Sequence, residues 1–250
     1  MRNDRVYEQS TGHAKGIKLK TLNEISKSLC IIKDLSQNQS SGFFLQIPND
    51  KKTIYILVTS YRAISDQLIK SKQVIEIIPE IGNIKQTIKL DTNERKIWLL
   101  QDKDIIAIEI LEKDNLINNV KFLNYDTKCK INEYGNYLNI DTFILHYPKG
   151  RDVECNCGRI LDIKNQKEFQ FLLSLYNEAK LPGSPILLFE NEKGESLVIG
   201  VHTSFLNGDK TNVGTFINVL IEKIIGKKYD DDYDYLGISK NKKLIFKFNK

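Results

Sequence analysis

Short apolar segments recur along most of the chain, and turn residues separate them. Many of these segments are rich in β-branched and aromatic residues, which is typical of β-strands. The first set covers Ser28–Lys33, Gly42–Ile47, Thr53–Thr59, Lys72–Ile78, Ile84–Leu90, Ile97–Leu100 and Asp104–Leu111. A second set covers Thr142–His146, Cys157–Ile163, Phe169–Ser174, Ser184–Glu190, Ser196–Ser204 and Gly214–Ile217. Because the longer helical periods of an α/β fold are scarce between them, this spacing predicts an all-β barrel or sandwich.

One amphipathic helix is predicted after the last of these strands. Apolar residues recur over Phe216–Ile225 at the spacing of one helical face, and Gly226 is placed to end the helix. Residues 1–25 are polar and rich in lysine, which predicts a loosely attached arm. Residues 227–250 form a charged tail in which an acidic cluster lies between lysine-rich patches. A solvated tail and a charged docking segment both stay open as interpretations.

Composition favours an ordinary folded protein. Of the 250 residues, 41% are hydrophobic and 28% are charged, which allows a substantial core. The formal net charge of +5 is spread along the sequence, so it does not indicate a nucleic-acid partner. We find no apolar run long enough to cross a bilayer and no apolar signal segment at the N-terminus. We therefore expect a cytoplasmic protein with no membrane partner.

The cysteines do not indicate a metal or a cofactor. Without an export signal, the four cysteines are expected to be reduced thiols. One residue separates Cys155 from Cys157, whereas a structural zinc site usually needs four ligands with wider spacing within each pair. Glycine-rich phosphate loops and paired catalytic carboxylates are also absent from the sequence. We therefore predict no metal and no cofactor.

Three segments of the first half resemble landmarks of the trypsin-like serine peptidases, in the order of that family. Ser40–Leu45 is similar to the strand that opens the first barrel. Ile56–Ile64 is similar to the strand and loop that carry the catalytic histidine. Asp104–Ile110 is similar to the segment that begins with the catalytic aspartate. Each likeness is weak alone, and their shared order makes the resemblance specific.

Two further landmarks follow in the second half. His146–Gly150 resembles the Gly-Tyr-Pro-Gly turn of the second barrel. Leu181–Ile186 and Val198–Thr203 resemble the segment around the catalytic serine and the strand after it, and the closest likeness is to the glutamyl-endopeptidase branch. The resemblance implies a chymotrypsin-like fold of two antiparallel six-stranded β-barrels with a C-terminal α-helix. It places the first barrel at residues 26–115 and the second barrel, with the helix, at residues 116–226.

The resemblance also implies that two of the three catalytic positions are lost. The reaction needs a serine nucleophile, a histidine base and an aspartate that orients the histidine. The histidine position is Arg62, the aspartate position is Asp104 and the serine position is Pro182. Arginine stays protonated and cannot act as a base, and proline offers neither a nucleophile nor an N–H for an oxyanion hole. We therefore expect a non-catalytic homologue in which Arg62 and Asp104 form an ion pair.

Ser184 is the alternative nucleophile. It follows the expected serine position by two residues, about 6–7 Å along an extended strand, which exceeds hydrogen-bond reach to the old base position. A rebuilt Ser184–His202 pair and a turn serine that satisfies nearby backbone are the two interpretations of this residue.

His202, Thr203 and Ser204 are the candidate peptide-binding residues. His202 resembles the histidine that helps to line the pocket for an acidic side chain in glutamyl endopeptidases, and a packed strand histidine is its other interpretation. The function predicted from the sequence is therefore a protein- or peptide-binding module that uses the groove between two barrels. Two alternatives stay open: an active endopeptidase that uses Ser184, and a structural subunit of a larger assembly. The sequence leaves the oligomeric state undetermined.

Overall fold

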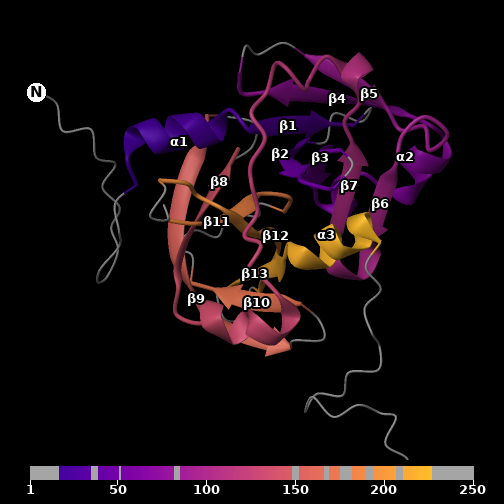
Figure 1. The fold of residues 1–250 in the computed structure, drawn as a ribbon. Helices are drawn as coiled ribbons and strands as arrows, with labels where there is room; N and C mark the ends of the chain where they lie inside the picture. The colour runs from indigo at the N-terminus through magenta and orange to yellow at the C-terminus, as the bar shows by residue number, and fades with distance from the viewer. Residues whose placement is uncertain are drawn as a thin grey trace, which may run out of the picture.

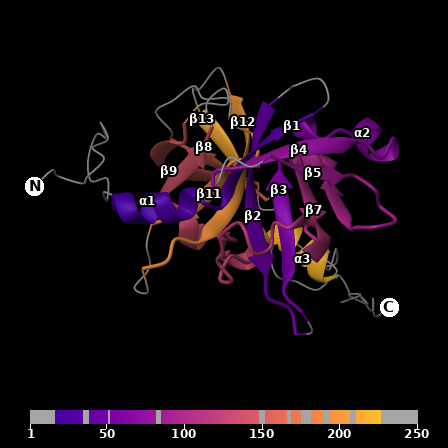
Figure 2. The same ribbon diagram turned by 90° about the horizontal axis from the view of Figure 1, so that it is seen from above.

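The computed structural model describes residues 17–34, 39–50, 52–81, 85–147, 152–165, 169–174, 182–189, 194–206 and 211–226. These residues form two antiparallel β units that lie side by side, with one α-helix at the C-terminal end (Figures 1 and 2). The predicted all-β class and the C-terminal helix are confirmed. The segments predicted as the extreme N-terminal arm and as the charged tail, residues 1–16 and 227–250, lie outside the described residues.

The N-terminal unit is a curled sheet of seven strands. Its strands are β1 (Leu29–Lys33), β2 (Gln39–Ile47), β3 (Ile54–Thr59), β4 (Val74–Pro79), β5 (Gln86–Lys89), β6 (Ile97–Leu100) and β7 (Ile105–Glu109). They are ordered β5-β4-β1-β2-β3-β7-β6, one strand more than the six expected. β3 pairs with β7, and Thr59 lies opposite Ile106. This pairing brings the loop that follows β3 next to the loop that precedes β7.

The C-terminal unit is a closed barrel. Its strands are β8 (Asp141–His146), β9 (Glu154–Asn165), β10 (Gln170–Leu173), β11 (Pro185–Leu188), β12 (Val198–Leu206) and β13 (Thr211–Phe216). The strands close in the order β10-β13-β12-β11-β8-β9, as the expected six-stranded barrel requires. Buried residues from several of these strands form one core, among them Ile144, Phe171, Ile186 and Phe216.

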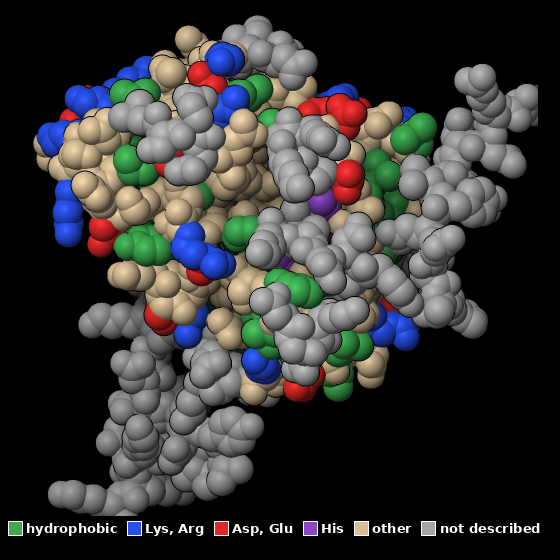
Figure 3. Space-filling view, turned by 180° about the vertical axis from the view of Figure 1, so that it is seen from behind, with side chains coloured by type: hydrophobic (Ala, Val, Ile, Leu, Met, Phe, Trp, Pro, Cys, Tyr) green, Lys and Arg blue, Asp and Glu red, His purple; other side chains and the backbone are tan. Residues whose placement is uncertain are grey.

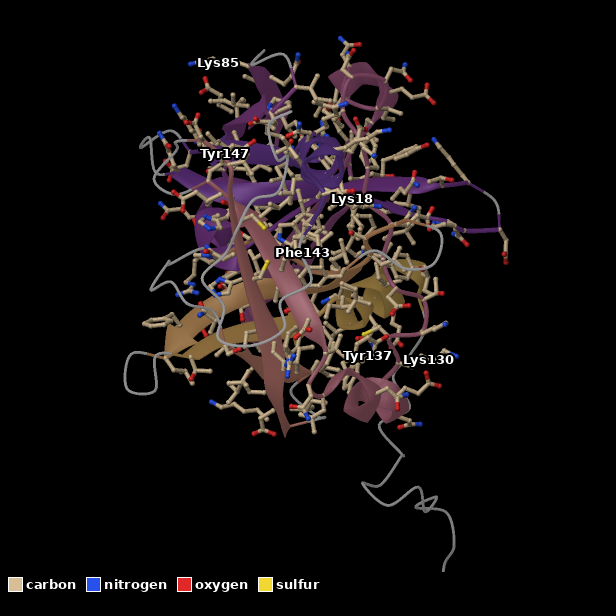
Figure 4. The ribbon with its side chains drawn as sticks, turned by 90° about the vertical axis from the view of Figure 1, so that its left-hand side faces the viewer. Lys18, Lys85, Lys130, Tyr137, Phe143 and Tyr147 are labelled. Carbon is tan, nitrogen blue, oxygen red and sulfur yellow. The ribbon has the colours of Figure 1, made fainter. Side chains whose placement is uncertain are left out.

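A shared core joins the two units. Phe43 and Val58 of the sheet belong to the same buried cluster as Phe143 and Val201 of the barrel. This explains why the apolar run of β3 does not alternate: neighbouring residues on the strand are buried on opposite faces, one within the sheet and one against the barrel. Figure 4 labels Phe143 on β8 and Tyr147 just beyond it, near the sheet, where the Tyr147 hydroxyl donates to Glu80 at 2.6 Å.

Two short α-helices were not predicted. α1 (Leu19–Ser26) occupies the end of the predicted arm, and its Leu22 and Ile25 side chains are buried in the shared core. The predicted loose attachment of residues 19–25 is therefore corrected: the four apolar residues from Ile17 to Ile25 are spaced by two to three residues, and this weak stripe is sufficient for one docked helix. α2 (Asp66–Lys70) is a single turn after β3.

The remaining helices connect the strands. The 3-10 helices are η1 (Tyr61–Ala63), η2 (Gln101–Lys103), η3 (Glu112–Asp114) and η4 (Ile131–Tyr137). α3 (Asn218–Ile225) ends at Gly226 as predicted and lies beside β6, where Lys223 donates to the Leu99 carbonyl at 2.6 Å (Figure 1). It begins two residues later than predicted because Phe216 belongs to β13. None of the helices among the described residues has the length and apolar character needed to span a membrane.

Candidate functional site

Arg62 and Asp104 form the predicted ion pair at the end of the sheet that faces the barrel. Arg62 lies in η1 directly after β3, and Asp104 directly precedes β7. The Arg62 side chain donates from Nε to Asp104 Oδ2 at 3.0 Å and from Nη2 to the same oxygen at 2.8 Å. The strand pairing of β3 with β7 therefore positions both partners without help from the barrel.

Further donors hold the Asp104 carboxylate. The buried Ser60 hydroxyl lies 3.0 Å from both carboxylate oxygens, and the Arg62 backbone N–H donates to Oδ1 at 3.0 Å. The Asp104 backbone has a left-handed conformation, with φ of 53°, which aspartate tolerates better than most residues. Charge-assisted bonds of this kind are among the strong hydrogen bonds of proteins, so the carboxylate is fixed in place.

Arg62 also connects the sheet to the barrel. Its Nη2 makes a short hydrogen bond to the carbonyl oxygen of Thr203 on β12. The Arg62 side chain is 62% exposed, whereas that of Asp104 is 18% exposed. We call Ser60, Arg62, Asp104 and the Thr203 carbonyl the interface cluster. The guanidinium of this cluster is a permanent donor and cannot accept a proton.

The turn at Pro182 packs against the same end of the sheet. Gly183, the next residue, has φ of 93°, and a Cβ at this position would lie 2.4 Å from the Ser41 carbonyl oxygen and 2.9 Å from the Ser60 nitrogen. Only glycine combines this backbone conformation with such a close approach. The structure therefore brings the Pro182 turn beside the residue that binds Asp104, although proline supplies no nucleophile there.

Ser184 lies in the barrel and not at the interface. His202 on β12 donates its backbone N–H to the Ser184 carbonyl at 2.9 Å, and Gly183 donates to the His202 carbonyl at 2.9 Å, which is the pattern of a β-bulge with glycine first. Ile186 of β11 pairs with Ile144 of β8, and this register places Ser184 opposite His146. Ser184 is completely buried, and its hydroxyl has no hydrogen-bond partner among the described residues.

The two histidines beside Ser184 are also completely buried. His146 Nε2 lies 2.6 Å from Asn156 Nδ2, and His202 Nε2 lies 2.8 Å from Asn212 Oδ1. Burial, with a smaller contribution from His202, lowers the pKa of His146 from 6.5 to about 4, so this imidazole is neutral at physiological pH. We call Ser184, His146, His202, Asn156 and Asn212 the barrel cluster.

The surrounding surface carries both signs of charge. Acidic and basic side chains of the described residues are interspersed on the face seen in Figure 3. The described residues contain no group of three or more histidine, cysteine, aspartate or glutamate side chains arranged to hold a metal ion.

Comparison with known proteins places this geometry in a known fold. No family model and no curated protein matches the chain. The inactive form of the Rv3671c protease of M. tuberculosis H37Rv is similar, with 12% identity, 83% of this chain and 92% of that chain covered, and a TM-score of 0.55. Deg5 is 15% identical over 82% of this chain and 90% of its own, also with a TM-score of 0.55. The chain has the chymotrypsin-like double-barrel fold.

A third similar structure agrees with this assignment. The serine endoprotease from Yersinia pestis is 12% identical over 83% of this chain and 65% of its own, with a TM-score of 0.55. At these identities the likeness concerns the fold.

The three predicted peptide-binding residues, which are consecutive in β12, differ in their exposure to solvent. His202 points into the barrel, and Thr203 is 2% exposed, while Ser204 is half-buried. From Ser204 to Leu206, β12 pairs with β13 on one side, and Thr203 lies at the register shift before this pairing. On its other side, strand pairing among the described residues ends where His202 meets Ser184. Within the described part of the chain, a short strand edge with no partner strand therefore begins at the carbonyl bound by Arg62.

Sequence reasoning missed two members of the interface cluster. Ser60 is two residues before Arg62 in the same quoted segment, so a polar residue this close to the predicted ion pair was an available signal. The Thr203 carbonyl had no such signal, because every residue carries a backbone carbonyl.

Proposed function

We propose that this chain is a non-catalytic homologue of the chymotrypsin-like serine proteases, and that it binds a protein or peptide segment where its two β units meet. The proposal assigns Arg62, Asp104 and Pro182 to the former catalytic positions. It assigns binding to the β12 edge that begins at Thr203.

The bonding of Arg62 is the observation that carries this proposal. A protease of this fold needs a neutral imidazole beside the carboxylate, able to take a proton from the nucleophile. Here a guanidinium occupies the place beside Asp104 and donates every shared proton itself. The adjacent turn offers Pro182, which has neither a hydroxyl nor a backbone N–H. Both the proton transfer and the nucleophilic attack therefore lack a participant.

The geometry gives the alternative nucleophile no support. A nucleophile has to lie about 3 Å from a reacting carbonyl and within hydrogen-bond reach of its base. Ser184 is completely buried, and its hydroxyl bonds to neither neighbouring histidine. A substrate carbonyl would have to enter the barrel to reach it.

The β12 strand edge could bind a peptide without cleaving it. An extended segment can add to an exposed strand edge through main-chain hydrogen bonds. The β12 edge from Thr203 to Leu206 has half-buried side chains at Ser204, Phe205 and Leu206. It begins at the interface cluster, where the two units meet, so a bound segment would lie against both.

A casein-cleavage assay with five proteins tests the proposal. The wild type, Arg62→His and Pro182→Ser are expected to leave casein intact, because each lacks at least one catalytic participant. Activity that arises in the double variant Arg62→His/Pro182→Ser would support the assignment of these positions. Cleavage by the wild type that is lost in Ser184→Ala would contradict the proposal and make this chain an active protease.

A further inference from the structure

We propose that Arg62 recognises a carboxylate, so that the segment bound at the β12 edge is acidic where it meets the interface cluster. This inference rests on the proposed function, and it names the chemical class of the partner. The ligand group is the side chain of one aspartate or glutamate.

The hydrogen bonds of Arg62 leave one part of its guanidinium unused. An arginine side chain has five N–H donors. Nε and Nη2 of Arg62 account for the bonds to Asp104 Oδ2 and to the Thr203 carbonyl. Nη1, which carries two of the donors, makes no hydrogen bond to any described residue, and the side chain is 62% exposed. The side chain therefore presents two N–H groups that a ligand can use.

This free end is already oriented. The two anchors come from different units, Asp104 from the sheet and Thr203 from the barrel, so the planar guanidinium has little freedom to rotate. Binding normally costs about 0.5–1.5 kcal/mol for each flexible side chain that becomes ordered. Most of that cost is absent for Arg62, which is ordered before the ligand arrives.

A carboxylate fits these donors better than a neutral acceptor does. Hydrogen bonds between ions are about twice as strong as those between neutral groups. The negative charge of Asp104 is already balanced in part before an anion arrives, because its carboxylate accepts hydrogen bonds from Ser60 and Arg62. The bond to the Thr203 carbonyl also fixes Nη1 at the start of the free edge, so a side chain of a segment on this edge can reach it.

The burial of His202 argues against the recognition of an acidic side chain by this histidine, which the resemblance implied. His202 is completely buried, and its Nε2 is bound to Asn212. An incoming acidic side chain cannot contact it at the surface. Arg62 therefore takes over the recognition of acid that the resemblance implied for His202.

Matched peptides test the inference by NMR on the full chain. The probes are five blocked alanine pentapeptides with glutamate at one of the five positions, and their five glutamine counterparts. The resonance of Arg62 Nε–H is identified by its absence in Arg62→Gln. We expect at least one glutamate peptide to shift this resonance and the amides from Thr203 to Leu206, and to bind about fivefold more tightly than its glutamine counterpart.

Two variants complete the design. Arg62→Gln is expected to bind each glutamate peptide and its glutamine counterpart equally. Arg159→Gln is the matched control, because Arg159 is also an exposed arginine paired with an aspartate, Asp141 at 2.6 Å, and it should keep the preference for glutamate.

The possible failures are distinguishable. Equal affinities for both peptide types, with the Thr203–Leu206 amides shifted, would overturn carboxylate recognition and leave the proposed binding function intact. No shift in this segment with any peptide would overturn both. Cleavage of a peptide, detected by mass spectrometry, would overturn the non-catalytic function itself.

Discussion

The interface cluster and the barrel cluster differ in charge, exposure and hydrogen bonding. In the interface cluster, the exposed Arg62 side chain is hydrogen-bonded to the Asp104 carboxylate, and the Ser60 hydroxyl bonds to the same carboxylate. In the barrel cluster, a serine and two histidines lie side by side, completely buried, and the serine hydroxyl is unbonded. A serine and two histidines are therefore grouped in the barrel cluster, where they are buried, whereas the aspartate Asp104 lies in the interface cluster.

This difference teaches that catalytic chemistry depends on position as well as on residue type. In the interface cluster, the group beside the Asp104 carboxylate is a guanidinium, which donates protons and cannot accept one. The barrel cluster holds a potential nucleophile and base, but Ser184 and both histidines are completely buried, and the Ser184 hydroxyl bonds to neither histidine. Four predictions, in order of decreasing effect, test this contrast.

Gly183→Ala should have the largest effect on the free energy of unfolding, because Gly183 lies between the interface cluster and the barrel cluster. The new Cβ would lie 2.4 Å from the Ser41 carbonyl oxygen at a φ of 93°. Left-handed backbone strain and overpacking together should lower the free energy of unfolding by about 2–5 kcal/mol. Urea denaturation measures this loss.

Gly194→Ala is the control for that substitution. Gly194 also has a positive φ, 73°, but an added Cβ would meet nothing within 4 Å. Gly194→Ala should lower the free energy of unfolding by about 1 kcal/mol, because backbone strain is the only cost of the substitution. Equal losses for the two variants would show that the Pro182 turn is not tightly packed against the sheet.

The stability of the barrel cluster should depend on pH through His146. Its pKa in the folded chain is about 4, below its usual value of 6.5, so the unfolded chain binds the proton first as pH falls. The stabilisation is complete above the unfolded pKa and decreases as pH falls toward the folded one. When the pH is lowered from 7.5 to 4.5, protonation of His146 alone should lower the free energy of unfolding by about 2–3 kcal/mol.

His146→Asn isolates that contribution. Urea denaturation of the wild type and the variant over the same pH range gives two slopes, and their difference belongs to this histidine. The wild type should lose stability more steeply than the variant. Parallel curves would mean that His146 is not held neutral by burial.

Replacing one buried serine in each cluster compares the two clusters directly. Ser60→Ala removes a hydroxyl bonded to the Asp104 carboxylate and should cost about 1–3 kcal/mol. Ser184→Ala removes a hydroxyl with no partner and should change the free energy of unfolding by less than about 1 kcal/mol, in the direction of greater stability. A large loss in Ser184→Ala would reveal a hydrogen bond that this account excludes.

Arg62→Gln should have the smallest effect on stability. Because the Arg62 side chain is 62% exposed, solvent weakens its ion pair, and the loss should be at most about 1 kcal/mol. The loss should also shrink as salt increases from about 0.02 M to about 0.5 M. Thermal denaturation at the two salt concentrations measures it, and a loss that is large and independent of salt would contradict the exposed geometry.

Most strands of the fold could be predicted from the sequence, for a physical reason. Segments such as Ile54–Thr59 carry apolar side chains toward two cores and therefore have a strong local pattern. Gly226 marked the end of α3 because its left-handed conformation favours glycine. α1 was missed because most of its residues are polar and only Leu22 and Ile25 are buried. All seven strands of the sheet overlap predicted segments, but their pairing into one seven-stranded sheet depends on long-range contacts, which a local pattern does not specify.

The candidate site was predictable only in part. The ion pair of Arg62 with Asp104 followed from the order of family-like segments, since each residue lies beside a recognisable strand. The grouping of His146, Ser184 and His202 needed the pairing of β8, β11 and β12, which is not encoded in any one segment. The burial of His202 also needed the closed barrel, because a strand histidine has the same sequence signature whether it faces in or out.

Fluorophosphonate labelling of the purified protein tests the central claim most directly. The reagent reacts with an activated serine, and intact-mass measurement with peptide mapping shows whether and where it is attached. Our account predicts no label on the wild type, because the Ser60 hydroxyl of the interface cluster is buried and bonded to Asp104, and the buried Ser184 hydroxyl bonds to neither neighbouring histidine. A label on Ser184 would contradict it and show that the barrel cluster is a working catalytic site.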